Sequence, residues 1–353
     1  MRLVFILDPL ASLATYKDSS LAMMRAAAGR GHKLFVAEQG GLFLRQDQAR
    51  LVVHGFRFIE GKSWYEIGEA HETAPESFDA VIMRKDPPFD NEFLYSTYLL
   101  EIAADQGAHI FNDPISLRDW NEKLGVARFP QFAPEFIVTR ERSLIRAFLA
   151  EHQDIVVKPL DGMGGSSIFR LTLSDPNISV ILETITEHGT RTIMAQRYLP
   201  QIVDGDKRII LIDGKPLPYA LARIPLAGET RGNLAAGGKG VAQPLTNRDR
   251  EIAETVGQVM QENGLFLVGL DVIGEHLTEV NVTSPTGMVE IAAQTDCDPA
   301  EIFMDALEQR ISATERTETT ETTERTETTE TTERTETTER TESTESTEST
   351  EKC

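Results

Sequence analysis

The chain of 353 residues has a formal net charge of -21 and only two cysteines, Cys297 and Cys353. This length allows two or three domains with cores of their own. The acidic balance argues against nucleic acid as a partner, and two cysteines exclude a disulfide framework, which indicates a reducing compartment. Because no apolar run reaches the length of a signal peptide or a membrane span, we expect a cytoplasmic protein with no membrane partner.

Strands and helices alternate in the first third of the chain. Strands are predicted at residues 3–7, 32–37, 80–83 and 108–111, and helices begin near Ser19 or Ser20, either of which is a possible N-cap, and near residue 91. This alternation predicts a parallel sheet, which binds ligands at the carboxyl ends of its strands.

Two segments follow these predicted strand ends. Asp8 and the loop at residues 17–20 follow the first strand, and Arg84 and Lys85 follow the strand at 80–83, ahead of a proline pair. Two cations on a stiff turn are suited to an anionic small molecule. A helix cap and a solvated turn are the alternatives for these two segments.

Residues 155–170 combine a β-branched strand, Lys158, a glycine loop and a second apolar strand. Glycines let backbone N–H groups approach phosphate oxygens, and the lysine adds a positive charge, so a nucleoside triphosphate is the expected ligand. A P-loop would place its lysine after the glycines and open a helix, and a dinucleotide fingerprint would need another glycine. A glycine-rich hairpin with a surface lysine remains the alternative.

The next segments are expected to complete a nucleotide site. A strand at 192–196 runs into a hinge at 197–200, whose backbone could face an adenine edge. A strand at 209–212 turns at Asp213 and Gly214 into a hairpin. The glycine-rich stretch 224–240 is too long for an ordinary connector and predicts either a lid, with Arg231 and Lys239 closing over phosphate, or a merely flexible loop.

A hairpin of two strands, 265–273 and 277–282, predicts a metal site. With residues 274–276 as its loop, Asp271 pairs with Glu279, and Asn281 lies on the same face because strand side chains alternate. Such hard oxygen ligands, with no basic residue between them, suit one or two Mg²⁺ ions; a solvated hairpin face is the alternative. The seven histidines show no zinc spacing, and Cys297 between two aspartates is a poor nucleophile.

The last forty or so residues repeat glutamate at every third position with threonine, serine and a few arginines between. This period matches no helix face and provides no core, so the segment is expected to be disordered. A repeat expansion without a role in the chemistry is favoured over an acidic interaction tail.

Four stretches together resemble the ATP-grasp ligases and, more narrowly, the bacterial glutathione synthetases: residues 83–90, 158–165, 229–238 and 279–285. The resemblance covers residues 1 to about 310. It implies an α/β fold, with a parallel α/β pre-ATP-grasp domain followed by a two-part ATP-grasp fold. The expected boundaries are 1–121 for the N-terminal domain, 122–192 for the small lid subdomain, 193–312 for the catalytic subdomain and 313–353 for the tail.

This resemblance implies that ATP, γ-glutamylcysteine and glycine give glutathione, ADP and phosphate through an acyl phosphate. ATP and Mg²⁺, or Mn²⁺, are the implied co-substrate and metal, and a homo-oligomer is expected. Another ATP-grasp ligase and a nucleotide-binding module without catalysis are the competing hypotheses.

The resemblance also implies roles for individual residues. The ATP site comprises Lys123 and Lys158 for phosphate, Gly162, Gly164 and Gly165 over the phosphates, Gln196, Tyr198 and Leu199 for adenine, and Asp206 near ribose or phosphate. The remaining site comprises Asp271, Glu279 and Asn281 for metal, Arg208 and Arg231 for catalysis, and Asp18, Ser19, Ser20, Arg84, Lys85, Arg223, Asn233 and Ser284 for the two substrates.

Overall fold

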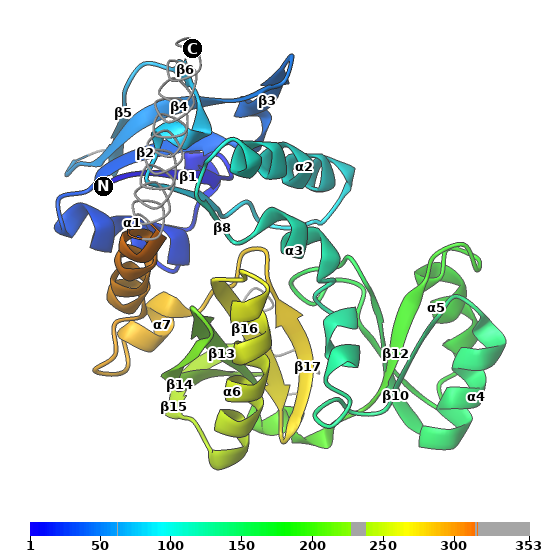
Figure 1. The fold of residues 1–353 in the computed structure, drawn as a ribbon. Coiled ribbons are helices and arrows are strands. Elements are labelled where there is room, and N and C mark those ends of the chain that lie inside the picture. Colours follow the sequence, from blue (N-terminus) through cyan, green and yellow to red (C-terminus); the bar gives the residue numbers. More distant parts are fainter. Residues whose placement is uncertain (62, 227–237, 315, 317–353) are drawn as a thin grey trace, which may run out of the picture. The chain divides into compact units, whose positions relative to one another are not determined.

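The computed structural model describes residues 1–61, 63–226, 238–314 and 316. The chain forms two units, Met1–Met304 and Asp305–Cys353, and in the second unit the described residues, 305–314 and 316, are helical. The first unit contains three β-sheets (Figure 1). The predicted lid residues Arg231 and Asn233 lie outside the described residues, and so does the tail predicted to be disordered at 313–353, except for residues 313, 314 and 316, which are helical.

The first sheet is built on the four strands that the N-terminal sequence predicts. Its central strand β1 pairs in parallel with β2 and β7, and β7 pairs in parallel with β8, so the expected parallel arrangement is confirmed for these strands. Their bounds and those of the flanking helices are β1 Arg2–Leu7, α1 Ser19–Gly29, β2 Lys33–Glu38, β7 Ala80–Met83, α2 Asn91–Asp105 and β8 Ile110–Phe111.

Four further strands extend this sheet in antiparallel fashion, and the sequence analysis missed them. The longest, β4, pairs with β2 and alternates buried and half-buried side chains along most of its length. That alternation was visible in the sequence as apolar residues at every second position. The added strands are β3 Leu42–Arg45, β4 Gln48–Phe58, β5 Tyr65–Ile67 and β6 His71–Thr73, and the main path runs β3-β4-β2-β1-β7-β8.

The second sheet carries the glycine loop. Its strand order is β11-β10-β12-β9, all antiparallel, and Val157 pairs with Phe169 across the loop, which confirms the predicted strand–loop–strand unit. Two helices pack their apolar faces on this sheet in a core of its own (Figure 1). The elements are β9 Phe136–Thr139, α4 Arg142–His152, β10 Asp154–Pro159, β11 Phe169–Thr172, α5 Ile178–Ile185 and β12 Ile193–Arg197.

The third sheet is antiparallel, in the order β15-β14-β13-β16-β17, and contains both predicted hairpins. Helix α6 begins with a capping box between Thr246 and Asp249 and buries Ile252, Val256 and Met260. The elements are β13 Asp206–Ile212, β14 Lys215–Ile224, β15 Lys239–Pro244, α6 Asn247–Glu262, β16 Leu267–Ile273 and β17 His276–Asn281.

The first and third sheets share one hydrophobic core. Val4 and Val81 of the first sheet belong to the same buried cluster as Val268 and Val280 of the third. Buried Asn112 reinforces this contact, because its amide donates to the carbonyl oxygens of Leu267 and Val282, each at 2.8 Å. The strand ends of the two sheets are therefore held at fixed positions.

The remaining elements are short, and residues 299–304 continue as a helix into the second unit. The short elements are η1 Leu10–Ser12, η2 Gln39–Gly41, η3 Pro75–Ser77, α3 Pro114–Asp119, η4 Leu124–Arg128, η5 Pro200–Asp204 and α7 Met288–Ala292.

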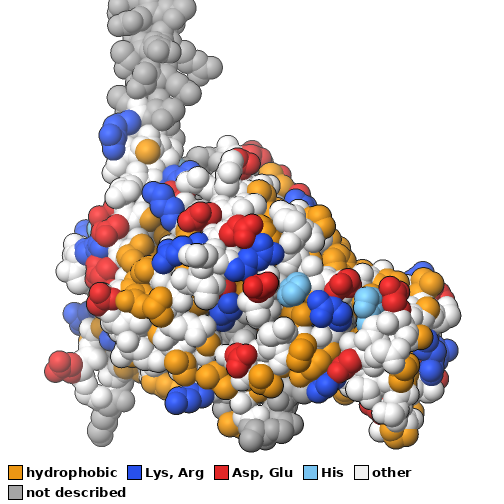
Figure 2. Space-filling view, turned by 90° about the horizontal axis from the view of Figure 1, so that it is seen from below, with side chains coloured by type: hydrophobic (Ala, Val, Ile, Leu, Met, Phe, Trp, Pro, Cys, Tyr) orange, Lys and Arg blue, Asp and Glu red, His pale blue; other side chains and the backbone are white. Residues whose placement is uncertain are grey.

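The surface of the molecule mixes both signs of charge. On the face shown in Figure 2, basic and acidic side chains of the described residues are interspersed, and no continuous basic surface is seen there. Within the described ranges, no helix is both long and apolar enough to cross a membrane.

Candidate active site

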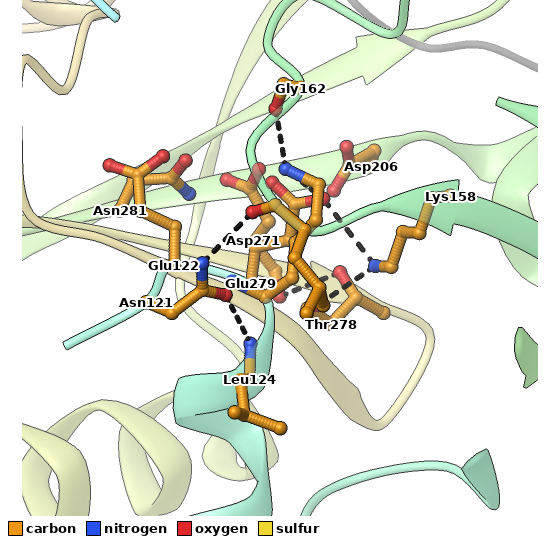
Figure 3. Close-up of polar contacts among 12 residues, drawn as sticks. Asn121, Glu122, Leu124, Lys158, Gly162, Asp206, Asp271, Thr278, Glu279 and Asn281 are labelled. Atoms are coloured by element: carbon orange, nitrogen blue, oxygen red, sulfur yellow. Dashed lines mark hydrogen bonds and ion pairs between the residues drawn. The ribbon is translucent and has the colours of Figure 1, made fainter. Parts of the chain in front are cut away.

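A cleft of about 610 Å³ lies where the three sheets meet. Its walls come from the end of β1, the glycine loop after β10, the segment after β12, and strands β13, β14, β16 and β17. The polar residues at its centre are drawn in Figure 3. Segments far apart in the sequence thus provide one continuous surface with charged groups on opposite walls.

Two buried lysines converge on one carboxylate in this cleft. Lys158 Nζ lies 3.4 Å from Glu279 Oε1 and 3.2 Å from the carbonyl oxygen of Thr278, to which it donates. Lys123 Nζ donates to the carbonyl oxygen of Gly162 at 2.6 Å and lies 3.8 Å from the same Glu279 oxygen. Burial lowers the pKa of Lys158. The two ammonium groups therefore face the cleft beside the glycine loop, where an anionic group would relieve their desolvation.

The predicted pairing of Asp271 with Glu279 is present, but a different turn produces it. The hairpin closes with a two-residue turn in which Ile273 pairs with His276, rather than with the predicted three-residue loop. A register shift after Asp271 then leaves Thr278 as an extra residue on β17. This β-bulge restores the pairing that the longer loop would have given.

Asp271 is surrounded by arginines, which corrects the prediction that no basic residue lies among the metal ligands. Its Oδ1 accepts from Arg208 Nε at 2.6 Å, and its Oδ2 lies 2.8 Å from Arg223 Nη2. All three side chains are buried. Burial alone would raise the pKa of Asp271, but the two arginine charges outweigh it and hold that pKa below its ordinary value. Asp271 therefore stays ionised.

Asp206 lies beside this group and pairs with Arg223. Burial raises the pKa of Asp206 to about 7, and the charges of Asp271 and Glu279 act in the same direction. Its Oδ1 is buried and has no hydrogen-bond partner among the described residues. An unpaired carboxylate oxygen at this position is chemically suited to a cation or a sugar hydroxyl.

The donor set at the hairpin fits a magnesium ion in its chemistry. Within the described ranges, no three His, Cys, Asp or Glu side chains are grouped as a metal site. The predicted site instead combines Asp271 and Glu279 with the amide of Asn281, which donates through Nδ2 to the Gly269 carbonyl and so keeps its own oxygen available. Hard oxygen ligands of this kind are preferred by Mg²⁺.

The segment after β12 and its neighbours give the cleft a partly apolar wall. Gln196, Tyr198 and Leu199 line the cleft there together with apolar side chains such as Val156 and Ile273. Arg170 stacks on the Tyr198 ring at 3.7 Å from its centroid, and Gln196 Nε2 is buried without a partner in the described part of the chain. This wall is suited to a planar ring with polar edges.

Three of the predicted substrate residues line the cleft, and four others do not. Asp18, Arg223 and Ser284 line the cleft, whereas Ser19, Ser20, Arg84 and Lys85 are absent from its lining as the described residues define it. Their contacts are with neighbouring segments of the fold: Arg84 donates to Ser20 Oγ and to the carbonyl oxygen of Pro285, each at 2.9 Å, and Lys85 pairs with Asp8 at 2.9 Å.

The N-cap of α1 also differs from the prediction. Asp18, rather than Ser19 or Ser20, accepts the hydrogen bond from the Leu21 backbone N–H at 2.9 Å. The helix starts one residue after Asp18, so the two serines already lie in its first turn, where both are buried. A carboxylate at this position satisfies a free backbone donor and favours the positive end of the helix dipole.

Two acidic residues of the cleft escaped the sequence analysis. Glu122, next to Lys123, lines the cleft, and burial raises its pKa. Glu290, in the first turn of α7, also lines the cleft, and its Oε2 is buried without a partner among the described residues. Glu122 could have been predicted as a site residue from the sequence, because it is a charged residue next to the predicted phosphate lysine Lys123. No pattern in the sequence around Glu290 distinguishes it as a site residue.

Comparison with known proteins now decides the family. The family model of the prokaryotic glutathione synthetase N-terminal domain matches residues 1–118, and that of the prokaryotic glutathione synthetase ATP-grasp domain matches residues 122–296. The chain belongs to the prokaryotic glutathione synthetase family. The resemblance inferred from the four motifs is thereby confirmed, and with it the assignment as an ATP-grasp ligase.

Relatives across most of the chain carry the same family name. A glutathione synthetase of Nitrosomonas europaea is 57% identical over 320 residues, covering 90% of this chain and 100% of the relative. A glutathione synthetase of Pseudomonas aeruginosa is 54% identical over 314 residues, covering 89% of this chain and 99% of the relative. The family assignment therefore extends over both sequence domains.

Solved structures support the fold. D-cycloserine synthetase DcsG matches with a TM-score of 0.62 and 16% identity, covering 88% of this chain and 99% of that chain. The ATP-grasp ligase PsnB, solved with its minimal precursor, Mg and ADP, matches with a TM-score of 0.57 and 14% identity, covering 88% and 98%. The predicted α/β fold with an ATP-grasp part is thereby confirmed.

Proposed function

We propose that this chain is a glutathione synthetase that joins γ-glutamylcysteine to glycine at the expense of ATP. The observation that carries the proposal is the convergence of Lys123, Lys158 and Glu279 opposite Asp271 in one cleft, in a member of this family. Positive charge on one wall and hard oxygen ligands on the other are what a metal–triphosphate complex requires.

ATP binds along the length of the central cleft. Its adenine lies against the hinge of Gln196, Tyr198 and Leu199, and Asp206 lies near the ribose or the phosphates. Lys123 and Lys158 hold the phosphates, with Gly162, Gly164 and Gly165 over them. These roles are supported by the burial of both lysines and by the positive φ of Gly164 and Gly165, which suits an open backbone loop.

Asp271, Glu279 and Asn281 would hold Mg²⁺, or Mn²⁺ in its place, which neutralises phosphate charge when bound. Because Asp271 is paired with Arg208 and Arg223, its carboxylate must share its oxygens between these arginines and a cation. Arg208 and Arg223 would then act next to the cation that Asp271 helps to hold.

The chemistry follows from the weak electrophilicity of a carboxylate. The cysteinyl carboxylate oxygen attacks the γ-phosphorus of ATP, the bond to the bridging oxygen breaks, and ADP leaves. The amine of glycine then attacks the acyl carbon, loses a proton, and phosphate departs with the electron pair of the carbon–oxygen bond. Arg208 stabilises the developing negative charge, and Arg231 would do so from the segment at residues 227–237. Excluding water protects the acyl phosphate from hydrolysis.

The two substrates occupy the end of the cleft formed by the first sheet. Asp18, with Ser19, Ser20, Arg84 and Lys85 in or behind the wall, receives the γ-glutamyl part, and Ser284 receives the glycine carboxylate. Arg223 and Asn233 contact either substrate. The burial of Arg84 and its bond to Pro285 next to Ser284 support a role in shaping both subsites.

The wider assignments follow from the same proposal. The enzyme acts in the cytoplasm on small molecules, without a nucleic-acid or membrane partner, and assembles as a homo-oligomer. Its domains span 1–121, 122–192 and 193–312, followed by the tail. The two family-model ranges and the mixed-charge surface support this organisation.

A coupled assay of phosphate release tests the proposal. Purified protein with ATP and Mg²⁺ is expected to release phosphate only when γ-glutamylcysteine and glycine are both present, with glutathione formed in equal amount. No stimulation by this pair, together with turnover of a different acid and amine, would assign the chain to another ATP-grasp activity. Nucleotide binding without any ADP formation would refute ligation altogether.

A further inference from the structure

The tripeptide of residues 121–123 connects two walls of the cleft. Asn121 donates through Nδ2 to the carbonyl oxygen of Leu160, at the start of the glycine loop, at 3.0 Å. Its Oδ1 accepts from the backbone N–H groups of Lys123 and Leu124 at 3.1 and 2.9 Å. Lys123 reaches the carbonyl oxygen of Gly162 at 2.6 Å. Asn121 and Lys123 therefore fix this tripeptide to the glycine loop.

Glu122 fixes the same tripeptide to strand β17. One oxygen, Oε1, accepts from the backbone N–H groups of Val282 and Thr283 at 3.0 and 3.1 Å and from Thr283 Oγ1 at 2.8 Å. The Glu122 carbonyl oxygen also accepts from the Val280 backbone N–H at 2.8 Å. Four hydrogen bonds thus join this residue to the strand end that carries Asn281.

We propose that Glu122 is a positioning residue that sets the distance between the phosphate lysine Lys123 and the metal-binding end of β17. The inference rests on the proposed nucleotide and metal roles of these two groups. One peptide bond links Glu122 to Lys123, and Asn281 lies between Val280 and Val282, which both donate to Glu122. The two groups belong to segments about 160 residues apart, as the separation of Glu122 and Val282 shows.

The chemistry of Glu122 suits this task better than that of a neutral acceptor. A carboxylate accepts stronger hydrogen bonds than an amide or carbonyl oxygen, which suits an oxygen that holds three donors. The side chain also lines a second cavity of about 70 Å³, behind the glycine loop, so packing alone does not hold it in place. Losing the hydrogen bonds would let the turn after β17 move independently of Lys123.

Nucleotide binding with and without metal tests the inference, and it needs neither amino-acid substrate. Calorimetry measures the dissociation constant of ADP in EDTA and in Mg²⁺ for the wild type and for Glu122→Ala, Glu122→Gln and Thr283→Val. In Glu122→Ala the tightening of ADP binding by Mg²⁺ is expected to fall by about tenfold to a hundredfold. Glu122→Gln, which keeps an acceptor oxygen, is expected to stay within about fivefold, and Thr283→Val to lie between them.

The controls separate positioning from stability. Adenosine, which has no phosphates, is expected to bind every variant as it binds the wild type, and exposed Glu254→Gln is expected to leave all constants unchanged. An unchanged Mg²⁺ effect in Glu122→Ala would overturn the inference, as would a Glu122→Gln variant as impaired as Glu122→Ala. If Glu122→Ala does not fold, an unchanged Mg²⁺ effect in Thr283→Val would overturn it. Absence of any ADP binding by the wild type would instead refute the proposed function.

Discussion

The two ends of the cleft use their charged residues differently. At the end formed by the second and third sheets, Lys158, Glu279, Asp271 and Arg208 contact one another across separate segments. At the end formed by the first sheet, the charged residues hold the ends of helices and strands: Asp18 caps α1, and Lys85 after β7 pairs with Asp8 after β1.

This difference has a consequence for mutational effects. At the end formed by the second and third sheets, Asp271, Arg208 and Arg223 are all buried, so removing the charge of one leaves the others uncompensated in a low-dielectric site. At the end formed by the first sheet, several charged partners are partly exposed, so water replaces a lost contact more readily. Substitutions are therefore expected to cost most at the metal hairpin and less toward the first sheet.

The largest loss is expected from Asp271→Asn. This change removes the charge that Arg208 and Arg223 share and one predicted metal ligand. Turnover is expected to fall by about 1000-fold, with a lower melting temperature. Phosphate release and thermal unfolding measure the two effects, and Asp47→Asn, at an exposed turn, is the matched control. A variant within tenfold of wild-type turnover would remove Asp271 from the proposed site.

Lys158→Ala and Glu279→Ala are expected to separate binding from turnover. Loss of the Lys158 charge weakens ATP binding by about 10-fold to 100-fold, because a charge-assisted contact to phosphate is lost. Loss of Glu279 mainly lowers kcat, since a metal ligand is removed from the site of phosphoryl transfer. Steady-state kinetics with varied ATP distinguish the two. If both variants keep wild-type rates, the active site lies elsewhere.

At the other end, Arg84→Lys is expected to have a moderate effect. A lysine keeps the charge but cannot bridge Ser20 Oγ and the Pro285 carbonyl oxygen as the guanidinium does. The KM for γ-glutamylcysteine is expected to rise about tenfold, with the KM for ATP within about twofold. Lys85→Met breaks a partly exposed pair with Asp8, so it is expected to raise the KM for γ-glutamylcysteine less than Arg84→Lys does. A larger change in the KM for ATP would show that the two ends are not independent.

The pH dependence of stability provides a smaller test at Asp206, whose folded-state pKa is raised by burial to about 7 from an ordinary value of 3.8. Because the folded state keeps a proton that the unfolded chain loses, this group lowers the free energy of unfolding as pH rises from about 4 to 7. Asp206→Asn removes this dependence. Its stability relative to wild type should therefore improve by on the order of 2 kcal/mol between pH 5 and pH 8.

Denaturant unfolding at both pH values measures this difference. Only the change with pH is diagnostic, because replacing the carboxyl group by an amide also changes stability by an amount that is independent of pH. A difference that stays constant between the two pH values would contradict a raised pKa at Asp206.

The smallest effect is expected from removing residues 314–353. Their repeated glutamate and threonine residues lie beyond the ranges of both family models. The kcat and KM values of the shortened chain are expected to match those of the full chain within about 20 percent, because this repeat of polar residues provides no apolar side chains for a core. Reduced turnover on truncation would show that the tail contributes to the activity.

Local patterns in the sequence determined the parts of this protein that depend on neighbouring residues. The glycine loop after Lys158, the hairpin turn at Asp213 and the four parallel strands of the first sheet follow from periodicity and turn residues within a few positions. The four motifs were also sufficient to recognise the family from the sequence, because phosphate and metal binding require these residue types. The antiparallel strand β4 was missed although its alternating pattern was present.

Only the tertiary structure decided which charges face one another. The pairs of Asp271 with Arg208 and of Glu122 with Thr283 join residues 63 and 161 positions apart, and no local pattern encodes such a contact. The bulge at Thr278, which brings Asp271 opposite Glu279 after a shorter turn, is likewise set by the packing of the whole sheet. Propensity acts over a few residues, whereas electrostatic and hydrogen-bond partners are chosen by the fold as a whole.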